Sequence, residues 1–211
     1  MSTVFETETR FLERPVGGSP RLLLVLAALL LVPIYVFPLW NMTLFAPQYP
    51  DGLRLFIYSY KLDGAHQGQD VREVNVLNHY IGMHDLTTED FTEFKWMPFV
   101  LGALGLLFLR AAVHGKIGDV LDVLVLAVYV GGYSLWSFGF KLWSYGHHLS
   151  PTAAVKVAPF MPPLFGHKQL ANFDVYSYPS LATYSLALAA ALLLLAAFFA
   201  WRGARPAGAR S

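Results

Sequence analysis

The sequence predicts an all-α integral membrane protein with four transmembrane helices and a small extracytoplasmic cap. Two observations predict this fold class. The chain of 211 residues is 55% hydrophobic and only 14% charged, which leaves too little polar surface for an ordinary soluble domain. The apolar residues are also concentrated in four stretches, each close to the roughly 20 residues that a helix needs to cross the hydrocarbon core of a bilayer.

Each of the four apolar stretches is expected to form one transmembrane helix. The second is the shortest and contains Arg110, so it spans the membrane only if this side chain reaches out to the interface. The third carries one acid, Asp122, near its start. The first is expected to remain as an uncleaved anchor, because no small-residue cleavage site follows it. The expected helices cover residues 22–40, 97–113, 120–140 and 180–201.

Basic residues set the expected orientation of these helices. The N-terminal segment, residues 1–21, and the C-terminal tail, residues 202–211, each carry three arginines, and the tail has no acid. The first long loop, residues 41–96, instead carries eight acidic residues against four basic ones. Short basic segments stay on the cytoplasmic side of a membrane. We therefore expect both termini inside, and the loops 41–96 and 141–179 outside.

The first outer loop is expected to fold into the cap, which would begin with a β-hairpin. Leu55 and Ile57 alternate with Phe56, as in a strand with two different faces, and a Pro-Asp-Gly turn signal at 50–52 precedes them. Residues 87–90 resemble a helix start that leads toward the second span. The second outer loop contains five prolines, so we expect it to be irregular.

Six of the seven histidines fall in the two outer loops, and two methionines lie among them. Imidazole and thioether groups are ligands that copper prefers, so the loops predict an outer-face copper site. The alternative is that these side chains are polar caps and core residues of a metal-free domain. His66 is expected to be only a turn residue. The candidate ligands are His79, Met83, His147, Met161 and His167, with His84 and His148 as further candidates.

The run at 78–84 is the strongest local signal in this set. If it is helical, His79 and Met83 stand four positions apart and project from one face. If it is extended, Gly82 permits a sharp turn that would direct the side chains of Met83 and His84 toward one point. The adjacent histidines at 147–148 would point apart in a strand, so one is expected to bind the ion and the other to assist.

Several function classes are excluded by what the sequence lacks. It contains no cysteine, so it has no disulfide, no thiolate metal site and no CxxCH haem attachment. The expected membrane helices contain no histidine, so no b-type haem is expected either. The sequence has no phosphate loop and no nucleophile elbow, so we expect no autonomous catalytic activity. No nucleic-acid partner is expected.

Several stretches of the chain resemble a family of small four-span bacterial membrane proteins that is associated with nitrous oxide reductase gene clusters of the clade II type. They are PLWNMTLFAPQYPDGLRLFIYSYKLDG, NVLNHYIGMHDL, KWMPF, WSYGHHLSPTAAVKV, PFMPPLFGHKQLANF and YSYPS. The resemblance implies an accessory of a periplasmic copper enzyme in the bacterial cytoplasmic membrane, with both loops on the periplasmic side. It supplies no catalytic residues. Phe45 and His84 depart from the family pattern.

Two functional hypotheses stay open. In the first, the chain is an accessory for copper handling or maturation, and the histidines and methionines named above form its site. In the second, it is a metal-free membrane anchor or a quinol-linked electron-transfer subunit that docks a periplasmic redox or copper protein within a membrane complex. The candidates for lining a quinone pocket are Trp136, Trp143 and Tyr145.

Overall fold

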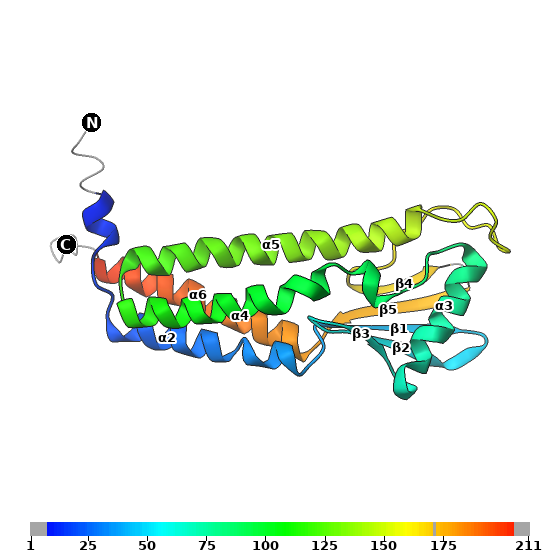
Figure 1. The fold of residues 1–211 in the computed structure, drawn as a ribbon, viewed down its shortest axis with the longest axis horizontal. Helices are drawn as coiled ribbons and strands as arrows, with labels where there is room; N and C mark the ends of the chain where they lie inside the picture. Colours follow the sequence, from blue (N-terminus) through cyan, green and yellow to red (C-terminus); the bar gives the residue numbers. More distant parts are fainter. Residues whose placement is uncertain (1–7, 171, 205–211) are drawn as a thin grey trace. The chain divides into compact units, whose positions relative to one another are not determined.

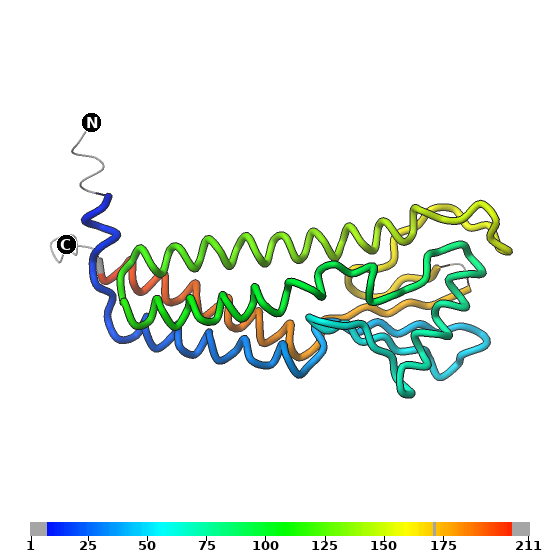
Figure 2. Tube along the Cα trace, viewed as in Figure 1, coloured from blue at the N-terminus to red at the C-terminus, as the bar shows by residue number. Residues whose placement is uncertain are grey.

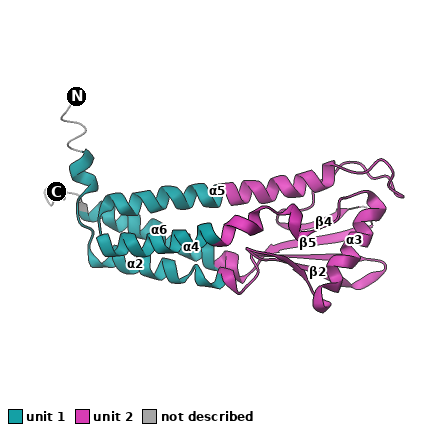
Figure 3. Ribbon diagram, in the orientation of Figure 1, with its two compact units in different colours: residues 1–33, 99–132, 185–211 teal, residues 34–98, 133–184 magenta. Residues whose placement is uncertain are grey.

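The computed structural model describes residues 8–170 and 172–204 (Figure 1). The ends of the two expected cytoplasmic segments, residues 1–7 and 205–211, lie outside this description. The chain divides into two compact units (Figure 3). Unit 1 comprises residues 1–33, 99–132 and 185–211, and unit 2 comprises residues 34–98 and 133–184.

Four helical segments are long and apolar enough to cross a membrane, as the sequence predicts, and they indicate a multi-pass membrane protein. The first, Gly18–Tyr35, combines helix α2 (Gly18–Leu29) with a short 3-10 helix at Val32–Tyr35. The other three are α4 (Glu93–His114), α5 (Ile117–His147) and α6 (Leu181–Ala204). Helix α4 begins four residues before the predicted span, and α5 continues seven residues past its predicted end.

In unit 1 the helical segments run alongside one another (Figure 2). Leu24, Phe108 and Leu193 fill its interior, together with buried alanines whose small side chains let membrane helices approach closely. The outer surface is apolar, since Leu106 and Val113 are 70% and 76% exposed. Such a surface suits contact with lipid better than contact with water.

Unit 2 is built on a five-stranded antiparallel sheet with the strand order β3-β2-β1-β5-β4 (Figure 1). Helix α3 (Gln69–Ile81) packs against this sheet, and 3-10 helices lie at His66–Gly68 and Thr88–Asp90. The strands are β1 (Trp40–Ala46), β2 (Tyr49–Ile57), β3 (Leu62–Gly64), β4 (Gly166–Leu170) and β5 (Phe173–Pro179).

The two faces of the sheet differ sharply in burial. The inner face carries alternate residues of the strands, including Met42, Leu55 and Val175, and these pack against Leu77 of α3 and Leu142 of α5. The outer face carries the residues between them. The expected alternation of Leu55 and Ile57 with Phe56 is therefore confirmed, with the leucine at position 55 only 3% exposed.

The prediction of an all-α protein is correct for the four apolar helices and wrong for the cap. The expected hairpin exists as β1 and β2, but the second outer loop, predicted to be irregular, adds β4 and β5. Its prolines cluster before residue 164 and at Pro179, the last residue of β5. The stretch between them contains no proline, so its backbone N–H groups can all join the sheet.

The turn of the hairpin lies earlier than predicted. Pro47 and Gln48 connect β1 to β2, whereas the Pro-Asp-Gly signal at 50–52 lies inside β2. Gly52 has a φ of +76° and lies where the β1–β2 register shifts. At this shift β2 contains more residues than the part of β1 that it faces. Its missing side chain also leaves room for the Phe45 ring, which would lie 2.8 Å from an added Cβ. The signal therefore marks a bulge.

Candidate functional site

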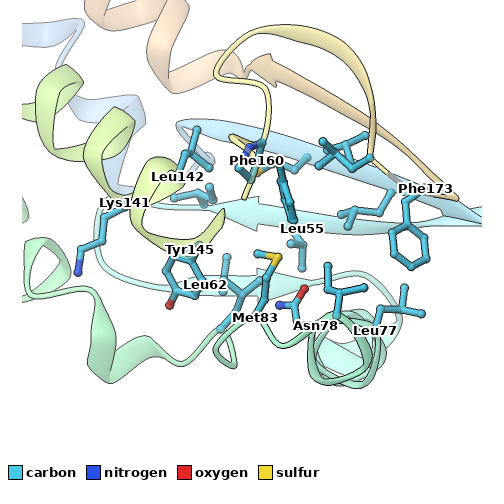
Figure 4. Close-up of a pocket in the computed structure, with 18 of the residues that line it drawn as sticks. Leu55, Leu62, Leu77, Asn78, Met83, Lys141, Leu142, Tyr145, Phe160 and Phe173 are labelled. Carbon is cyan, nitrogen blue, oxygen red and sulfur yellow. The ribbon is translucent and has the colours of Figure 1, made fainter. Parts of the chain in front are cut away.

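The run at 78–84 is helical only in its first half. Helix α3 ends at Ile81, and Gly82 adopts a left-handed conformation with a φ of +78°. The Met83 N–H donates to the Asn78 carbonyl at 2.9 Å, which closes the end of the helix. His79 is exposed on the last turn, whereas Met83 lies beyond the helix and lines an apolar cavity (Figure 4). The i, i+4 face that a fully helical run would give this pair is not formed.

The two loops that carry the histidines meet next to this helix end. The Ser150 N–H donates to the Gly82 carbonyl at 2.7 Å, and the Val155 N–H donates to the Tyr80 carbonyl at 2.9 Å. A Cβ on Gly82 would lie 2.8 Å from Ala153 Cβ, so the glycine allows the second loop to approach closely. The structure therefore brings the backbone of residues 80–82 next to the backbone of residues 150–155.

His147 is the last residue of α5 and His148 follows it, so the end of a helix lies where an irregular loop was expected. The His147 ring stacks on Trp143 with centroids 4.5 Å apart, and its Nδ1 lies 2.8 Å from the Trp143 carbonyl oxygen. His148 Nδ1 lies 3.1 Å from both the carbonyl and the hydroxyl oxygen of Ser144. Each ring is thus held through one nitrogen by an oxygen of the preceding turn.

His167 and Met161 lie on different sides of the sheet. His167 projects from the outer face of β4, where its Nε2 is 2.8 Å from Asp174 Oδ1 and its ring stacks on Tyr176. Met161 is partly buried against the hydrophobic core formed by the inner face. Since alternate residues of a strand face opposite ways, the sheet separates these two candidate ligands.

The candidate ligands are therefore distributed over the end of α3, the end of α5 and the two faces of the sheet. Among residues 8–170 and 172–204, no group of three or more His, Cys, Asp or Glu side chains is placed to hold a metal ion. His84 is exposed after α3. His66, expected to be a turn residue, lies in the 3-10 turn before α3 and pairs with Asp70 at 2.8 Å. A copper site at these residues stays a prediction.

The outer face of the sheet carries a group of exposed rings that the sequence reasoning did not single out. Phe45 meets Tyr176 edge to face with centroids 5.7 Å apart, and Phe165 meets Tyr178 in the same way at 5.4 Å. His167 stacks on Tyr176 with centroids 4.5 Å apart. We call these five residues the aromatic face. The alternation of Asp174, Tyr176 and Tyr178 was the sequence signal for it.

A second row of rings follows one side of α5. Tyr133, Trp136, Phe140 and Trp143 contact one another in succession with centroids 5.6–5.9 Å apart, and His147 completes the row. Trp136 and Trp143, predicted to line a quinone pocket with Tyr145, belong to this exposed row. Tyr145 instead lines the interior cavity of unit 2. The three residues therefore do not line one common pocket.

Comparisons with known proteins do not identify the chain. No protein-family model, no curated protein and no solved structure matches it. We therefore infer the function from the residues, their geometry and the sequence resemblance.

Proposed function

We propose that the chain is a membrane accessory protein of a periplasmic copper enzyme system, with nitrous oxide reduction as the process to which the sequence resemblance points. The four apolar helices anchor it in the bacterial cytoplasmic membrane with both termini inside, and unit 2 works on the periplasmic side. Its role is to dock and support the enzyme or a redox protein that serves it, without catalysis of its own.

The observation that carries this proposal is the aromatic face. The solvent side of an antiparallel sheet is ordinarily polar, whereas here four large rings and an imidazole share it. Phe165 is 67% exposed and Tyr178 is 44% exposed. Exposed aromatic residues supply much of the binding energy at protein interfaces, and the polar His167–Asp174 pair next to them suits an interface rim.

The order of strands and apolar helices along the chain supports the proposed membrane topology. Strand β1 follows the first apolar segment, and β5 ends two residues before the last apolar helix begins. The two halves of unit 2 are separated by two spans, so they leave the membrane on the same side. The acidic first loop and the basic ends of the chain favour the periplasmic side for unit 2.

Co-purification from membranes tests the docking role. The tagged full-length chain is isolated from mildly solubilised membranes, and bound proteins are identified by mass spectrometry. A periplasmic copper or redox protein is expected with the native chain and is expected to be lost with Phe165→Ser and Tyr176→Ser together. The matched control is Tyr60→Ser, an exposed ring in the turn before β3 that is outside the aromatic face. Equal recovery with all three chains would contradict the proposal.

Copper handling is a second candidate function, and the orientation of the imidazoles favours it. Metal-ligating histidines commonly hold one ring nitrogen on a backbone carbonyl or a carboxylate while the other binds the ion. His147 has this arrangement with the Trp143 carbonyl, and His167 has it with Asp174. The predicted ligands, His79, Met83, His147, Met161 and His167, would not all serve one ion, because the sheet separates Met161 from His167.

Metal analysis of the purified full-length protein tests this second function. Copper above the background of a mock purification is expected, and it should fall when His79 and His147 are both replaced with alanine. His66→Ala is the matched control, because that imidazole is already paired with Asp70 in a turn. A copper content of the native protein no higher than that of the mock purification would overturn copper handling. It would not affect the docking role.

A further inference from the structure

The turn between α4 and α5 is held by the chain that leads into α2, and all of these segments belong to unit 1 (Figure 1). The Val16 N–H donates to the Gly115 carbonyl at 2.7 Å. The Ile117 N–H donates to the Arg14 carbonyl at 3.1 Å. An antiparallel bridge also joins Lys116 to the chain before α2. The structure therefore fixes the backbone that carries Arg14 against the backbone that carries Lys116.

Arg21, in the first turn of α2, places its guanidinium against the same turn. Gly115 has a φ of +64°, and a Cβ added to it would lie 2.0 Å from a terminal nitrogen of Arg21 and 2.2 Å from its Cζ. The guanidinium thus occupies the space that a side chain at position 115 would need. The glycine is required both for the left-handed backbone and for the approach of this cation.

The positive charges at this turn are poorly balanced. In the part of the chain that the structure describes, neither Arg21 nor Lys116 forms a salt bridge, and the exposed Glu13 forms none either. Asp119, in the first turn of α5, lies 3.5 Å from His114 instead. The N-terminus of α2 has no side-chain cap and no acid in its first turn, so the positive end of the helix dipole adds to the charge.

The partly buried guanidinium of Arg21 is the strongest sign of an anionic ligand. It is a planar group with five N–H donors, which matches the oxygens of a phosphate. Burial of a charge is costly unless an opposite charge and hydrogen bonds accompany it. Because Arg21 is only partly exposed and has no carboxylate at ion-pair distance, a phosphate would supply both.

The surroundings of the turn favour a lipid as the source of this phosphate. The turn joins two of the helices that are long and apolar enough to cross a membrane, and the chain beside it leads directly into another such segment. Leu22, next to Arg21, is 60% exposed, and Val113, two residues before Gly115, is 76% exposed. Basic side chains thus adjoin exposed apolar ones, which suits a molecule with an anionic head and hydrocarbon chains.

We propose that this turn binds an anionic phospholipid, with the phosphate held by the Arg21 guanidinium and by the Lys116 ammonium. Arg14 contributes a further positive charge beside it. The acyl chains of the lipid lie along the apolar surface of unit 1. The inference does not depend on the docking role, because its residues belong to unit 1 and the aromatic face belongs to unit 2.

Native mass spectrometry of the full-length protein in detergent tests the proposal. The probe is phosphatidylglycerol, and phosphatidylcholine with the same acyl chains is the zwitterionic reference. We expect tighter binding of the first phosphatidylglycerol than of phosphatidylcholine. Arg21→Gln and Lys116→Gln should each weaken phosphatidylglycerol binding by about fivefold, the effect of one basic residue near an anionic surface. Lys116 is exposed, so its substitution leaves the packing of the turn intact.

Arg202→Gln is the matched control, because it removes one positive charge from the end of α6, where the guanidinium lies over the Phe198 ring. It should leave phosphatidylglycerol binding unchanged. An equal loss with Arg202→Gln would mean that net charge alone attracts the lipid, and it would overturn the proposal. Equal affinity of the native protein for both lipids, or unchanged affinity in Arg21→Gln and Lys116→Gln, would overturn it as well. Displacement of the lipid by excess inorganic phosphate would identify free phosphate as the ligand and contradict a lipid site.

Discussion

The Trp40 indole donates a 2.8 Å hydrogen bond to the Ser177 hydroxyl, across 137 positions of the chain. Trp40 opens β1 after the first apolar segment, and Ser177 lies in β5 before the last one. The bond lies within a continuous antiparallel pairing of the two strands. The two loops between the spans therefore fold as one domain, and neither can complete the sheet without the other.

An engineered disulfide tests this pairing directly. Thr43 and Tyr176 are partners in the β1–β5 register, so cysteines at both positions should cross-link upon mild oxidation. The chain has no cysteine of its own that could compete. The control combines Thr43→Cys with Val175→Cys, whose side chain faces the opposite side of the sheet. Cross-linking of the control as fast as the test pair would contradict the register.

Substitution of Gly82 should loosen the contact between the two loops. Gly82→Ala places a Cβ 2.8 Å from Ala153 Cβ and forces a non-glycine residue to a φ of +78°. We expect the free energy of unfolding to fall by about 1–3 kcal/mol, measured by denaturant titration with near-UV circular dichroism. Gly166→Ala is the control, because its φ is +92° but its Cβ would meet nothing within 4 Å. If both variants lost the same free energy of unfolding, the close approach of Gly82 to Ala153 would contribute nothing to stability.

Asp70 is expected to be a structural residue. It is 2% exposed, its Oδ1 pairs with His66, and its Oδ2 accepts the Arg54 backbone N–H at 2.8 Å. Asp70→Ala leaves that part-buried N–H without its acceptor, so the free energy of unfolding should fall by about 1–3 kcal/mol. Asp70→Asn keeps an acceptor and should cost less. An alanine variant as stable as the native protein would show that water replaces the carboxylate.

The Tyr49–Glu73 pair predicts a particular response to acid. The Tyr49 hydroxyl donates to the Glu73 carboxylate, and this hydrogen bond is the main cause that lowers the pKa of Glu73, followed by a bond from Gln69. Because the folded pKa lies below the unfolded value of about 4.3, this stabilisation is present above that pH and is lost as the pH falls through the folded pKa.

Tyr49→Phe should therefore raise the pKa of Glu73 toward its ordinary value and flatten the acid dependence of stability. The pKa is measured by NMR titration of the glutamate carboxyl, and the stability by denaturant titration between neutral and acidic pH. Lys61→Met is the control, because Lys61 is the main cause that lowers the pKa of Asp63 and should leave Glu73 unaffected. An unchanged Glu73 titration in Tyr49→Phe would contradict the assignment.

The membrane helices could be predicted from sequence because a span requires a long apolar run, which is a local property. The hairpin could be predicted for the same reason, since Leu55 and Ile57 alternate with their neighbours within one strand. The pairing of Trp40 with Pro179 could not, because it joins distant segments of which each is compatible with several partners. Proline density also obscured β4 and β5, although the prolines lie outside their interiors.

The candidate site shows the same division between local and distant information. Sequence spacing would put His79 and Met83 on one face if the run were helical, but the left-handed Gly82 ends the helix between them. The aromatic face could be foreseen only in part, from the alternation within β5, because it combines Phe45 of the first loop with Tyr176 of the second. Ring types alone do not tell which of two sheet faces they share until the strand register is known.

The most direct test of the proposed docking role is photocross-linking in living cells. A photoreactive phenylalanine analogue replaces Phe165, the most exposed ring of the aromatic face, and the product is identified by mass spectrometry. The same analogue at Tyr60 provides the reference. The docking role predicts a covalent product with a periplasmic copper or redox protein at position 165 and none at position 60. Products with cytoplasmic proteins, or the same products at both positions, would contradict it.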